Sequence, residues 1–513
     1  MKKLSQLLRT IDDNLFHWTF IAFIVAVSLL PKFPLQHVEY TYIKIRIDDL
    51  LPVILCLVFF IQWARRKLQL RTKFFWNVMA FWAAVFISFA FGYYYLHTIR
   101  EPVFNVGLLH SLRRVQYMIV FFVAMSAVIS DARFKTYLKT YFITLLLVAL
   151  YGIGQKFPMI IADRQFCLPS IQSMNPAYVD GRLLCLSMSD RVNSTFGGHF
   201  DLAGYVTFSI PIIIGLYFSR NHKRYVGLFI LALLILLYTS ARSSFLAYLA
   251  STFLFILFAR RWKFFFLALA LTGALLLTTK DMTKRFAQTF QVKTVFINEQ
   301  TGQEQVSQKI SVNNLPAGNA KVNSKLTDKL TATKPKVSDE EIRQAAINEV
   351  VANANQKGEV LTTVQIQQRA NEISKFIKPQ QLVLCDISCS TRLQVEWPRA
   401  IAAFQTSPLL GTGPYSLTEA TDNDILRWLG EFGLLGTTLF MALLIRICVT
   451  TWKYAKKYSE PFVLYGFVFG TVALLINALY VDVFEASKIA YNFWTVAGLM
   501  VGLQYAKKSH KPS

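Results

Sequence analysis

Long apolar runs separated by short polar segments make up most of the chain. The runs are about 17–25 residues long and apolar on all sides, and a run of this length crosses a bilayer as a single α-helix. Helices placed on these runs give about twelve expected spans, at 15–31, 47–63, 74–92, 113–129, 140–157, 199–218, 226–240, 243–258, 264–279, 425–447, 461–480 and 489–504. The pattern predicts an all-α, polytopic membrane protein.

The break between the seventh and eighth runs is short and polar. It reads Thr239-Ser240-Ala241-Arg242-Ser243-Ser244. One kinked helix could cover both runs, but so many small polar residues favour two helices that turn at the outer face.

Three longer polar segments remain between the runs, at 93–112, 158–198 and 280–424. The third is too polar to insert into a membrane, although 345–356 and 364–377 have the composition of helices. We therefore expect four regions. They are helices one to five with an outer loop (1–184), helices six to nine (185–279), one large extracytoplasmic loop (280–424), and helices ten to twelve with a cytoplasmic tail (425–513).

The distribution of charge along the chain agrees with this placement of helices and loops. The net charge of the 513-residue chain is +24, and its basic residues form short clusters beside the ends of the runs. Such clusters are typical of cytoplasmic loops, so both termini are expected in the cytoplasm. The same clusters can contact anionic membrane lipids. Nucleic acid is not expected as a partner, because the basic residues form no continuous stripe.

The basic N-terminus precedes an apolar run without a small-residue cleavage site, which favours a retained first span.

The cysteines divide in the same way. Cys56 and Cys448 lie in expected spans, whereas Cys167, Cys185, Cys385 and Cys389 lie in expected outer segments. Cysteines outside the cytoplasm favour one or two disulfides. Cys167 and Cys185 would close a loop, while Cys385 and Cys389 could pair locally or with the other two. A zinc site is less favoured, because histidine ligands are missing.

Several arginines oppose the usual charge bias. Arg191, Arg242 and Arg392 are expected outside, each beside a span, and Arg113 and Arg114 lie at the outer end of the fourth span. Each could simply reach the interface or a helix end. Arginine also suits phosphate, and the phosphates at an outer membrane face belong to lipid head groups and lipid-linked pyrophosphates. Three arginines around one cavity could stabilise a pyrophosphate leaving group, which predicts group transfer from a polyprenyl carrier.

Strings around these arginines resemble those of the O-antigen ligase and O-antigen polymerase family. RVNSTFGGHFDLAGYV, from Arg191, is similar to the family's R-x-x-G-T-F-x-x-x-N-x-L-A-x-x-L, and TSARSSFLAYLAS is similar to its T-x-S-R-G-x-x-L-A. Residues 392–416 resemble R-x-x-x-W-x-x-A-x-x-x-x-x-x-P-L-x-G-x-G, and DNDILRWLGEFGLLG, from Asp422, resembles H-N-x-x-L-x-x-L-x-E-x-G-x-x-G. VDVFEASKIAYNFWTVAGLMVGL resembles the closing span. The strings occur in the family's order over about residues 185–505.

This resemblance implies a multi-span, inverting glycosyltransferase of the C type in the bacterial plasma membrane. The donor would be an undecaprenyl-pyrophosphate-linked glycan at the outer face, and the acceptor a glycan, a lipid or a protein. No metal or cofactor is implied. Arg191, Arg242 and Arg392 would hold the pyrophosphate, with Arg242 and Arg392 acting directly in catalysis. Arg114, His199, Asn423 and Asp424 would contribute to substrate binding.

The chain departs from the family at Asp422, where the ligases have histidine. A carboxylate can also take a proton from a sugar hydroxyl. Asp422, Asp424 or, less favoured, Glu431 could serve as the base, but Asp422 or Asp424 could instead cap the tenth span. His199 could likewise be a base or a capping residue. The missing histidine favours a polymerase or a divergent member over a lipid A–core ligase.

Two other classes of function fit the sequence less well. A transporter or flippase of lipid-linked oligosaccharide would usually show internal repeats and broken spans, and no repeat is visible. A non-catalytic partner in envelope assembly could use the large polar insert for binding.

Overall fold

The computed structural model describes residues 2–36, 38–39, 45–157, 159–161, 164–170, 185–186, 191–287, 289–306, 337–417 and 420–506. It divides into two compact units. The first, here called the helical unit, comprises Met1–Thr283 and Arg399–Ser513. The second, the inserted unit, comprises Lys284–Pro398.

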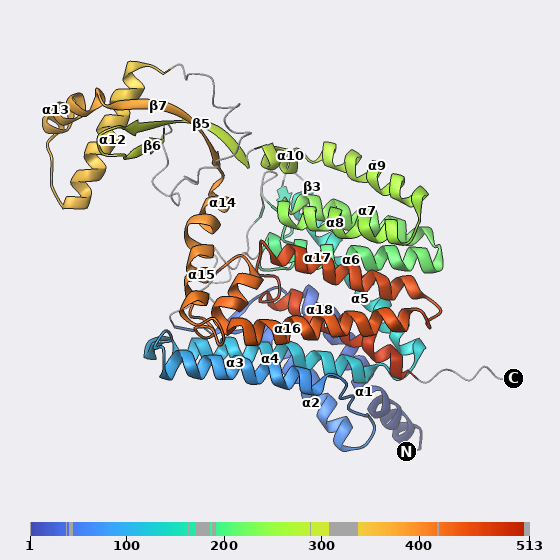
Figure 1. Ribbon diagram of the computed structural model, residues 1–513. Helices are drawn as coiled ribbons and strands as arrows, with labels where there is room; N and C mark the ends of the chain where they lie inside the picture. Colours follow the sequence, from blue (N-terminus) through green and yellow to red (C-terminus); the bar gives the residue numbers. More distant parts are fainter. Residues whose placement is uncertain are drawn as a thin grey trace. The chain divides into compact units, whose positions relative to one another are not determined.

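The helical unit contains a long helix at each of the twelve predicted runs, and many of these helices lie side by side in Figure 1. They are α1 (Lys2–Leu29), α2 (Ile47–Ala64), α3 (Phe75–Tyr94), α4 (Phe104–Ala127), α5 (Asp131–Lys156), α6 (His199–Arg220), α7 (Lys223–Tyr238), α8 (Arg242–Phe258), α9 (Trp262–Thr278), α16 (Asp424–Ala455), α17 (Pro461–Ala478) and α18 (Ser487–Gly502). The predicted turn between the seventh and eighth runs is confirmed, because α7 ends at Tyr238 and α8 begins at Arg242.

Within the described residues, seven helices are long and apolar enough to cross a membrane. They are α2, α3, α4 with the short 3-10 turn before it (Glu101–Val103), α5, α6, α16 and α17. The helices α7, α8, α9 and α18 have 16 or 17 residues, fewer than a typical span, and α1 has a polar first half. The chain is thus a mostly helical protein with seven candidate membrane-spanning helices among the described residues, while the count of twelve spans stays a prediction.

Glycines bring four of these helices into close contact. A Cβ atom on Gly470 of α17 would lie 2.5 Å from the carbonyl oxygen of Phe208 in α6, and one on Gly466 would lie 2.5 Å from that of Pro211. In the same way, a Cβ on Gly498 of α18 would lie 2.5 Å from the Phe121 carbonyl oxygen in α4. Small residues at helix contacts are typical of membrane proteins, in which backbones gain van der Waals energy by approaching closely.

The helix α16 is broken at Gly433, whose φ of 63° and ψ of −164° are essentially restricted to glycine. The break frees backbone groups, and the turn at 408–413 satisfies them. The N–H groups of Thr412 and Gly413 donate to the carbonyl oxygens of Gly430 and Glu431, at 2.8 and 2.9 Å. Such a break is tolerated at membrane depth only when protein covers it.

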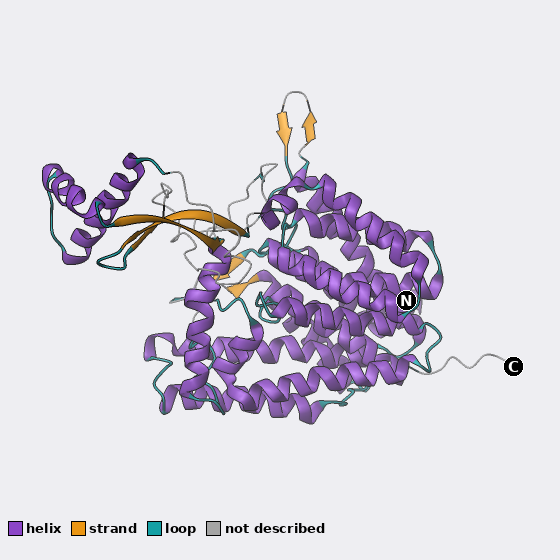
Figure 2. Ribbon diagram, turned by 45° about the horizontal axis from the view of Figure 1, so that its top comes forward, coloured by secondary structure: helices purple, strands orange, loops and turns teal. Residues whose placement is uncertain are grey.

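The inserted unit is an α/β structure with its own core. The antiparallel strands β5 (Phe290–Asn298), β6 (Glu304–Val306) and β7 (Ile377–Cys385) form a sheet in the order β6-β5-β7, drawn in orange in Figure 2. Helices α12 (Asp339–Lys357) and α13 (Thr363–Ser374) pack on it through a core that includes Phe296, Ala346 and Ala370. Both helices begin with a capping box.

The all-α prediction therefore holds for the helical unit apart from two short hairpins, but it missed this sheet. Strand β5 pairs with β7 over the full length of both strands, although they are far apart in the sequence, so the pairing has no local sequence signal. The two predicted helices are confirmed as parts of α12 and α13, with the second ending earlier than expected, at Ser374.

The remaining elements are short. They are two hairpins, β1 (Pro34–Gln36) with β2 (Ile45–Arg46) and β3 (Met159–Ile161) with β4 (Arg164–Phe166), and the helices α10 (Lys280–Ala287), α14 (Ile387–Thr391) and α15 (Trp397–Thr406), with a π-helical turn at Arg392–Glu396. Two disulfides join Cys167 to Cys185 and Cys385 to Cys389. The second pair therefore closes locally, which is one of the two pairings left open by the sequence.

Candidate functional site

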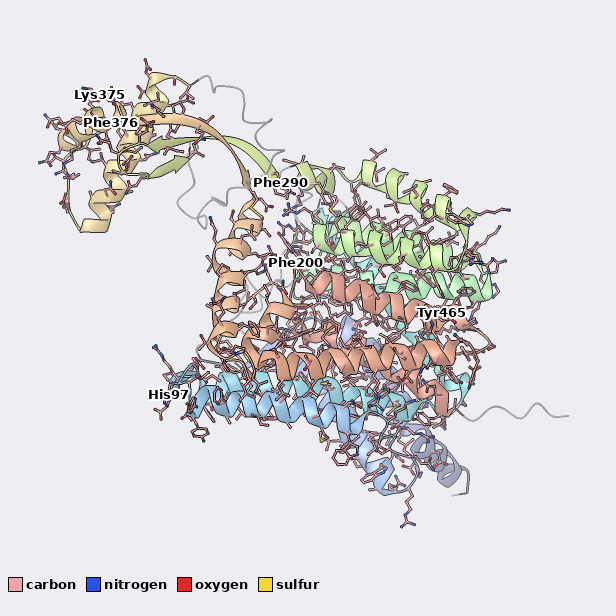
Figure 3. All side chains as sticks on the ribbon, viewed as in Figure 1. His97, Phe200, Phe290, Lys375, Phe376 and Tyr465 are labelled. Atoms are coloured by element: carbon pink, nitrogen blue, oxygen red, sulfur yellow. A yellow bond between two sulfur atoms is a disulfide. The ribbon has the colours of Figure 1, made fainter. Side chains whose placement is uncertain are left out.

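Sequence-distant segments meet at one end of the helical unit. The meeting point, here called the junction, comprises residues 191–199, the α7–α8 turn at 239–244, the start of α16 at 421–427 and the segment 479–488. Phe200, next to His199, lies toward this end of the helices in Figure 3, and Tyr465 of α17 lies toward the other end. The junction contains most of the residues predicted to form the site.

Arg191 and His199 are in direct contact. A guanidinium N–H of Arg191 donates to Nε2 of His199 at 2.6 Å. The next residue, Val192, donates its backbone N–H to the carbonyl oxygen of Tyr238 at 3.2 Å. Tyr238 ends α7, and Arg242 is the first residue of α8. The Arg191 segment therefore lies beside the turn that carries Arg242. The sequence strings gave only the order of these two segments along the chain.

A fully buried lysine holds the Arg191 segment in place. Lys488 donates from Nζ to the carbonyl oxygens of Leu30 at 2.6 Å, Thr195 at 2.7 Å and Ser28 at 3.1 Å. Its ammonium also lies 4.9 Å from the centre of the Phe196 ring. Lys488 thus joins α18, the end of α1 and the 191–199 segment. A charge within an otherwise apolar run is a functional candidate by default, and this signal was visible in the sequence at the start of the closing span.

The other side of the junction forms around the end of α17. Ser244, two residues after Arg242, donates its hydroxyl to Asn477 Oδ1 at 3.2 Å. Asn423 donates from Nδ2 to the Leu479 carbonyl oxygen at 3.0 Å, and its backbone N–H donates to Asp482 Oδ1 at 3.0 Å. The end of α17 therefore contacts both the Arg242 turn and the start of α16.

Asn423 is the capping residue of α16. Its Oδ1 accepts a hydrogen bond from the backbone N–H of Leu426 at 3.0 Å, which is the standard N-cap contact. Asp424 is fully buried and its Oδ2 accepts the backbone N–H of Phe484 at 3.0 Å. Asp422 is half-buried, with a left-handed φ of 50°. The cap is therefore neither of the two aspartates that the sequence suggested.

A buried network of ion pairs extends from the junction to α4. Arg114 of α4 contacts Glu431 at 3.0 Å and Glu485 at 2.7 Å. Arg427 contacts Glu431 at 3.3 Å and Asp482 at 2.6 Å. The Arg114, Arg427 and Glu431 side chains are at most 6% exposed. Charges taken out of water in this way are stable only when paired and hydrogen-bonded, and each of these has a partner of opposite sign.

Arg114 is paired within the protein by this network. The sequence predicted a substrate-binding cation, whereas its guanidinium lies between two carboxylates and over the ring of Phe432, at 4.5 Å. The sequence suggested Glu431 only as a less favoured base and did not indicate Arg427, Asp482 or Glu485. The signal available was the spacing of Arg427 and Glu431, which places both on one face of a helix.

Four helices begin at the junction, namely α6, α8, α16 and α18. The first turn of a helix has free N–H groups and a positive dipole end, both of which favour an anion. His199 and Arg242 are the first residues of α6 and α8. The junction therefore combines positively charged arginine side chains with the positive N-terminal ends of helix dipoles.

Arg392 belongs to the inserted unit. It is buried, begins the π-helical turn at 392–396, and donates to the carbonyl oxygen of Ser388 at 2.6 Å and to the Ser388 hydroxyl. Its predicted role beside Arg191 and Arg242 stays a prediction.

Among the described residues, no group of three or more His, Cys, Asp or Glu side chains is placed to hold a metal ion.

Comparison with known proteins does not assign the chain to a family. No model of a known protein family matches the chain. No curated protein is significantly similar to it either.

Proposed function

We propose that this protein is a membrane glycosyltransferase of the O-antigen polymerase or ligase type. It would transfer a glycan from undecaprenyl pyrophosphate to a glycan, lipid or protein acceptor at the outer face of the bacterial plasma membrane. One observation carries the proposal. The two arginine-bearing strings are held side by side by the hydrogen bond from Val192 to Tyr238, at an end of the bundle where four helices begin.

In the proposed reaction, the acceptor hydroxyl oxygen attacks the anomeric carbon of the donor sugar. The bond from that carbon to the pyrophosphate oxygen breaks, and its electron pair leaves with the pyrophosphate. The hydroxyl proton passes to the Asp422 carboxylate, and the anomeric configuration inverts. Arg191 and Arg242 stabilise the negative charge that develops on the leaving group. Asp422 fits the role of base better than Asp424, because the latter is fully buried against the Phe484 backbone.

A transporter of lipid-linked glycan is the second candidate, and the broken helix α16 favours it. Transporters often place interrupted helices and charged residues at the substrate site. The break at Gly433 lies two residues from Glu431, which belongs to the buried network. Such a protein would move the carrier across the bilayer without breaking the glycosidic bond.

Reconstitution of the full chain in vesicles with undecaprenyl-pyrophosphate oligosaccharide separates the two. The enzyme releases undecaprenyl pyrophosphate and lengthens or transfers the glycan, whereas the transporter changes only the leaflet of the carrier. We expect Arg242→Ala and Arg392→Ala to lower transfer by about 10²–10³-fold and Asp422→Asn by about 10²–10⁴-fold.

Arg446→Ala is the matched control. Arg446 is exposed and contacts Asn77 near the other end of α16, so this variant should transfer glycan at the wild-type rate. Full activity in Arg242→Ala and Asp422→Asn would overturn the assignment of these residues. Carrier movement without any glycan product would overturn the enzyme in favour of the transporter.

A further inference from the structure

A groove opens on the helical unit at the end opposite the junction. It has a volume of about 600 Å³ and lies between α5 and α7, with α6 behind it. Its walls are apolar over most of their length and include Leu138, Phe142 and Leu146 of α5 and Leu228 and Leu231 of α7. Its rim is basic and includes Lys135, Lys139, Arg220 and Arg224.

The rim has more positive charge than the protein itself neutralises. Lys135 pairs with Asp131 at 2.7 Å, and Arg220 pairs with Glu460 at 2.8 Å. Lys139 and Arg224 are exposed, and within the described part of the chain neither has a carboxylate within 4.0 Å. The guanidinium of Arg224 is held over the Tyr225 ring at 5.0 Å. Two cations are thus available to an anion at the mouth of an apolar groove.

The groove fits within one leaflet of a bilayer. From Lys139 to Leu146 the wall advances seven residues along α5, which is about 10 Å at the rise of an α-helix. Half of a typical hydrocarbon core is about 15 Å. An acyl chain whose phosphate lies beside Lys139 would therefore contact the groove over most of one leaflet.

We propose that this groove binds one anionic phospholipid of the adjacent leaflet, with its phosphate between Lys139 and Arg224 and an acyl chain along α5 and α7. Basic rims above apolar inter-helical grooves are suited to acidic head groups. This site is separate from the junction and does not depend on the proposed transfer reaction. The basic clusters predict that the rim faces the cytoplasm.

Two variants of the full-length protein test the proposal. Lys139→Gln with Arg224→Gln removes the two available charges, and binding of phosphatidylglycerol, followed by native mass spectrometry from detergent, should weaken by about 30-fold. Gly227→Leu fills the groove from α7, since a side chain at Gly227 meets no atom within 4 Å. It should remove the bound lipid without disturbing packing.

Matched controls show whether the effects are local. Lys456→Gln with Lys457→Gln removes the same charge from exposed residues outside the groove, and Gly273→Leu adds the same side chain to α9, where it also meets no atom. Both should keep wild-type binding. Equal losses in the test and control variants would overturn the proposal. Equal binding of phosphatidylcholine, or of glycerol 3-phosphate without acyl chains, would also overturn it.

Discussion

At the scale of single residues, buried charges are the main constraint on the helical unit. Glu431 is fully buried and accepts contacts from both Arg114 and Arg427, and its Oε1 also accepts the backbone N–H of Tyr415 at 3.1 Å. The negative charge of this one carboxylate is therefore shared between two guanidinium groups, and its hydrogen bond to Tyr415 holds the 408–417 turn. Both oxygens of Glu431 are engaged in these contacts, so Glu431 fits the role of base less well than Asp422 does.

We expect Glu431→Gln to lower the free energy of unfolding by about 3–5 kcal/mol, because it leaves two buried guanidinium groups short of negative charge. Equilibrium unfolding of the purified protein in mixed detergent micelles measures this. Asp13→Asn is the control. Asp13 forms an exposed ion pair with Lys67, and such pairs contribute at most about 1 kcal/mol. Similar small losses in both variants would show that the buried network adds no stability.

At the scale of elements, α16 shows how hydrogen bonds from a neighbouring turn stabilise a break in an apolar helix. The N–H groups of Leu434 and Leu435 donate to the carbonyl oxygens of Pro408 and Leu409, at 2.8 and 3.0 Å. The Ser88 hydroxyl adds a hydrogen bond to the Glu431 carbonyl oxygen at 2.5 Å. The glycine-rich turn at 408–413 and the break at Gly433 therefore form one structure.

Gly433→Ala should lower the free energy of unfolding by about 3 kcal/mol, from an unfavourable backbone conformation and a clash. Its Cβ would overlap the backbone of Leu409. Gly273→Ala is the control, because that position is helical and its Cβ meets nothing within 4 Å. Thermal unfolding of the detergent-solubilised variants measures both. An unchanged melting temperature for Gly433→Ala would mean that the break is not fixed as described.

At the scale of the whole molecule, the chain combines a bundle of largely apolar helices with an inserted α/β unit. The inserted unit has its own sheet, core and disulfide, and the core side chains of Phe296, Ala346 and Ala370 are at most 2% exposed. These features are those of a segment that can fold alone.

A fragment covering 284–398 should therefore be soluble and unfold cooperatively on heating, as followed by circular dichroism. Ala346→Asp, which places a charge in the core, should abolish the transition. Asp339→Asn, in the exposed first turn of α12, should keep it. A non-cooperative wild-type fragment would show that the unit needs the rest of the chain.

The predicted topology has a direct test. Alkaline phosphatase inserted at 317 should be active, because that segment is expected outside the cytoplasm, and green fluorescent protein fused after 513 should fluoresce in the cytoplasm. Inactive phosphatase with fluorescent protein would place the inserted unit on the cytoplasmic side and remove the basis for an outer-face reaction.

The sequence by itself determined where the helices lie. Apolar runs fix helix positions because a membrane requires every backbone group to be satisfied within the helix, and Thr239–Ser244 marked the α7–α8 turn correctly. It also identified Arg191 and Arg242 as candidates from their charge and expected side of the membrane, and His199 from the family resemblance. Only the tertiary structure decided that Asn423 caps α16, that Arg114 is paired with Glu431 and Glu485, and that Lys488 holds the Arg191 segment. The Arg114 and Lys488 contacts join residues far apart in the chain, so they depend on helix packing and leave no local signal in the sequence. The cap is a local contact, from Asn423 to Leu426, but Asp422, Asn423 and Asp424 are all residue types that cap helices, so the sequence alone did not distinguish them.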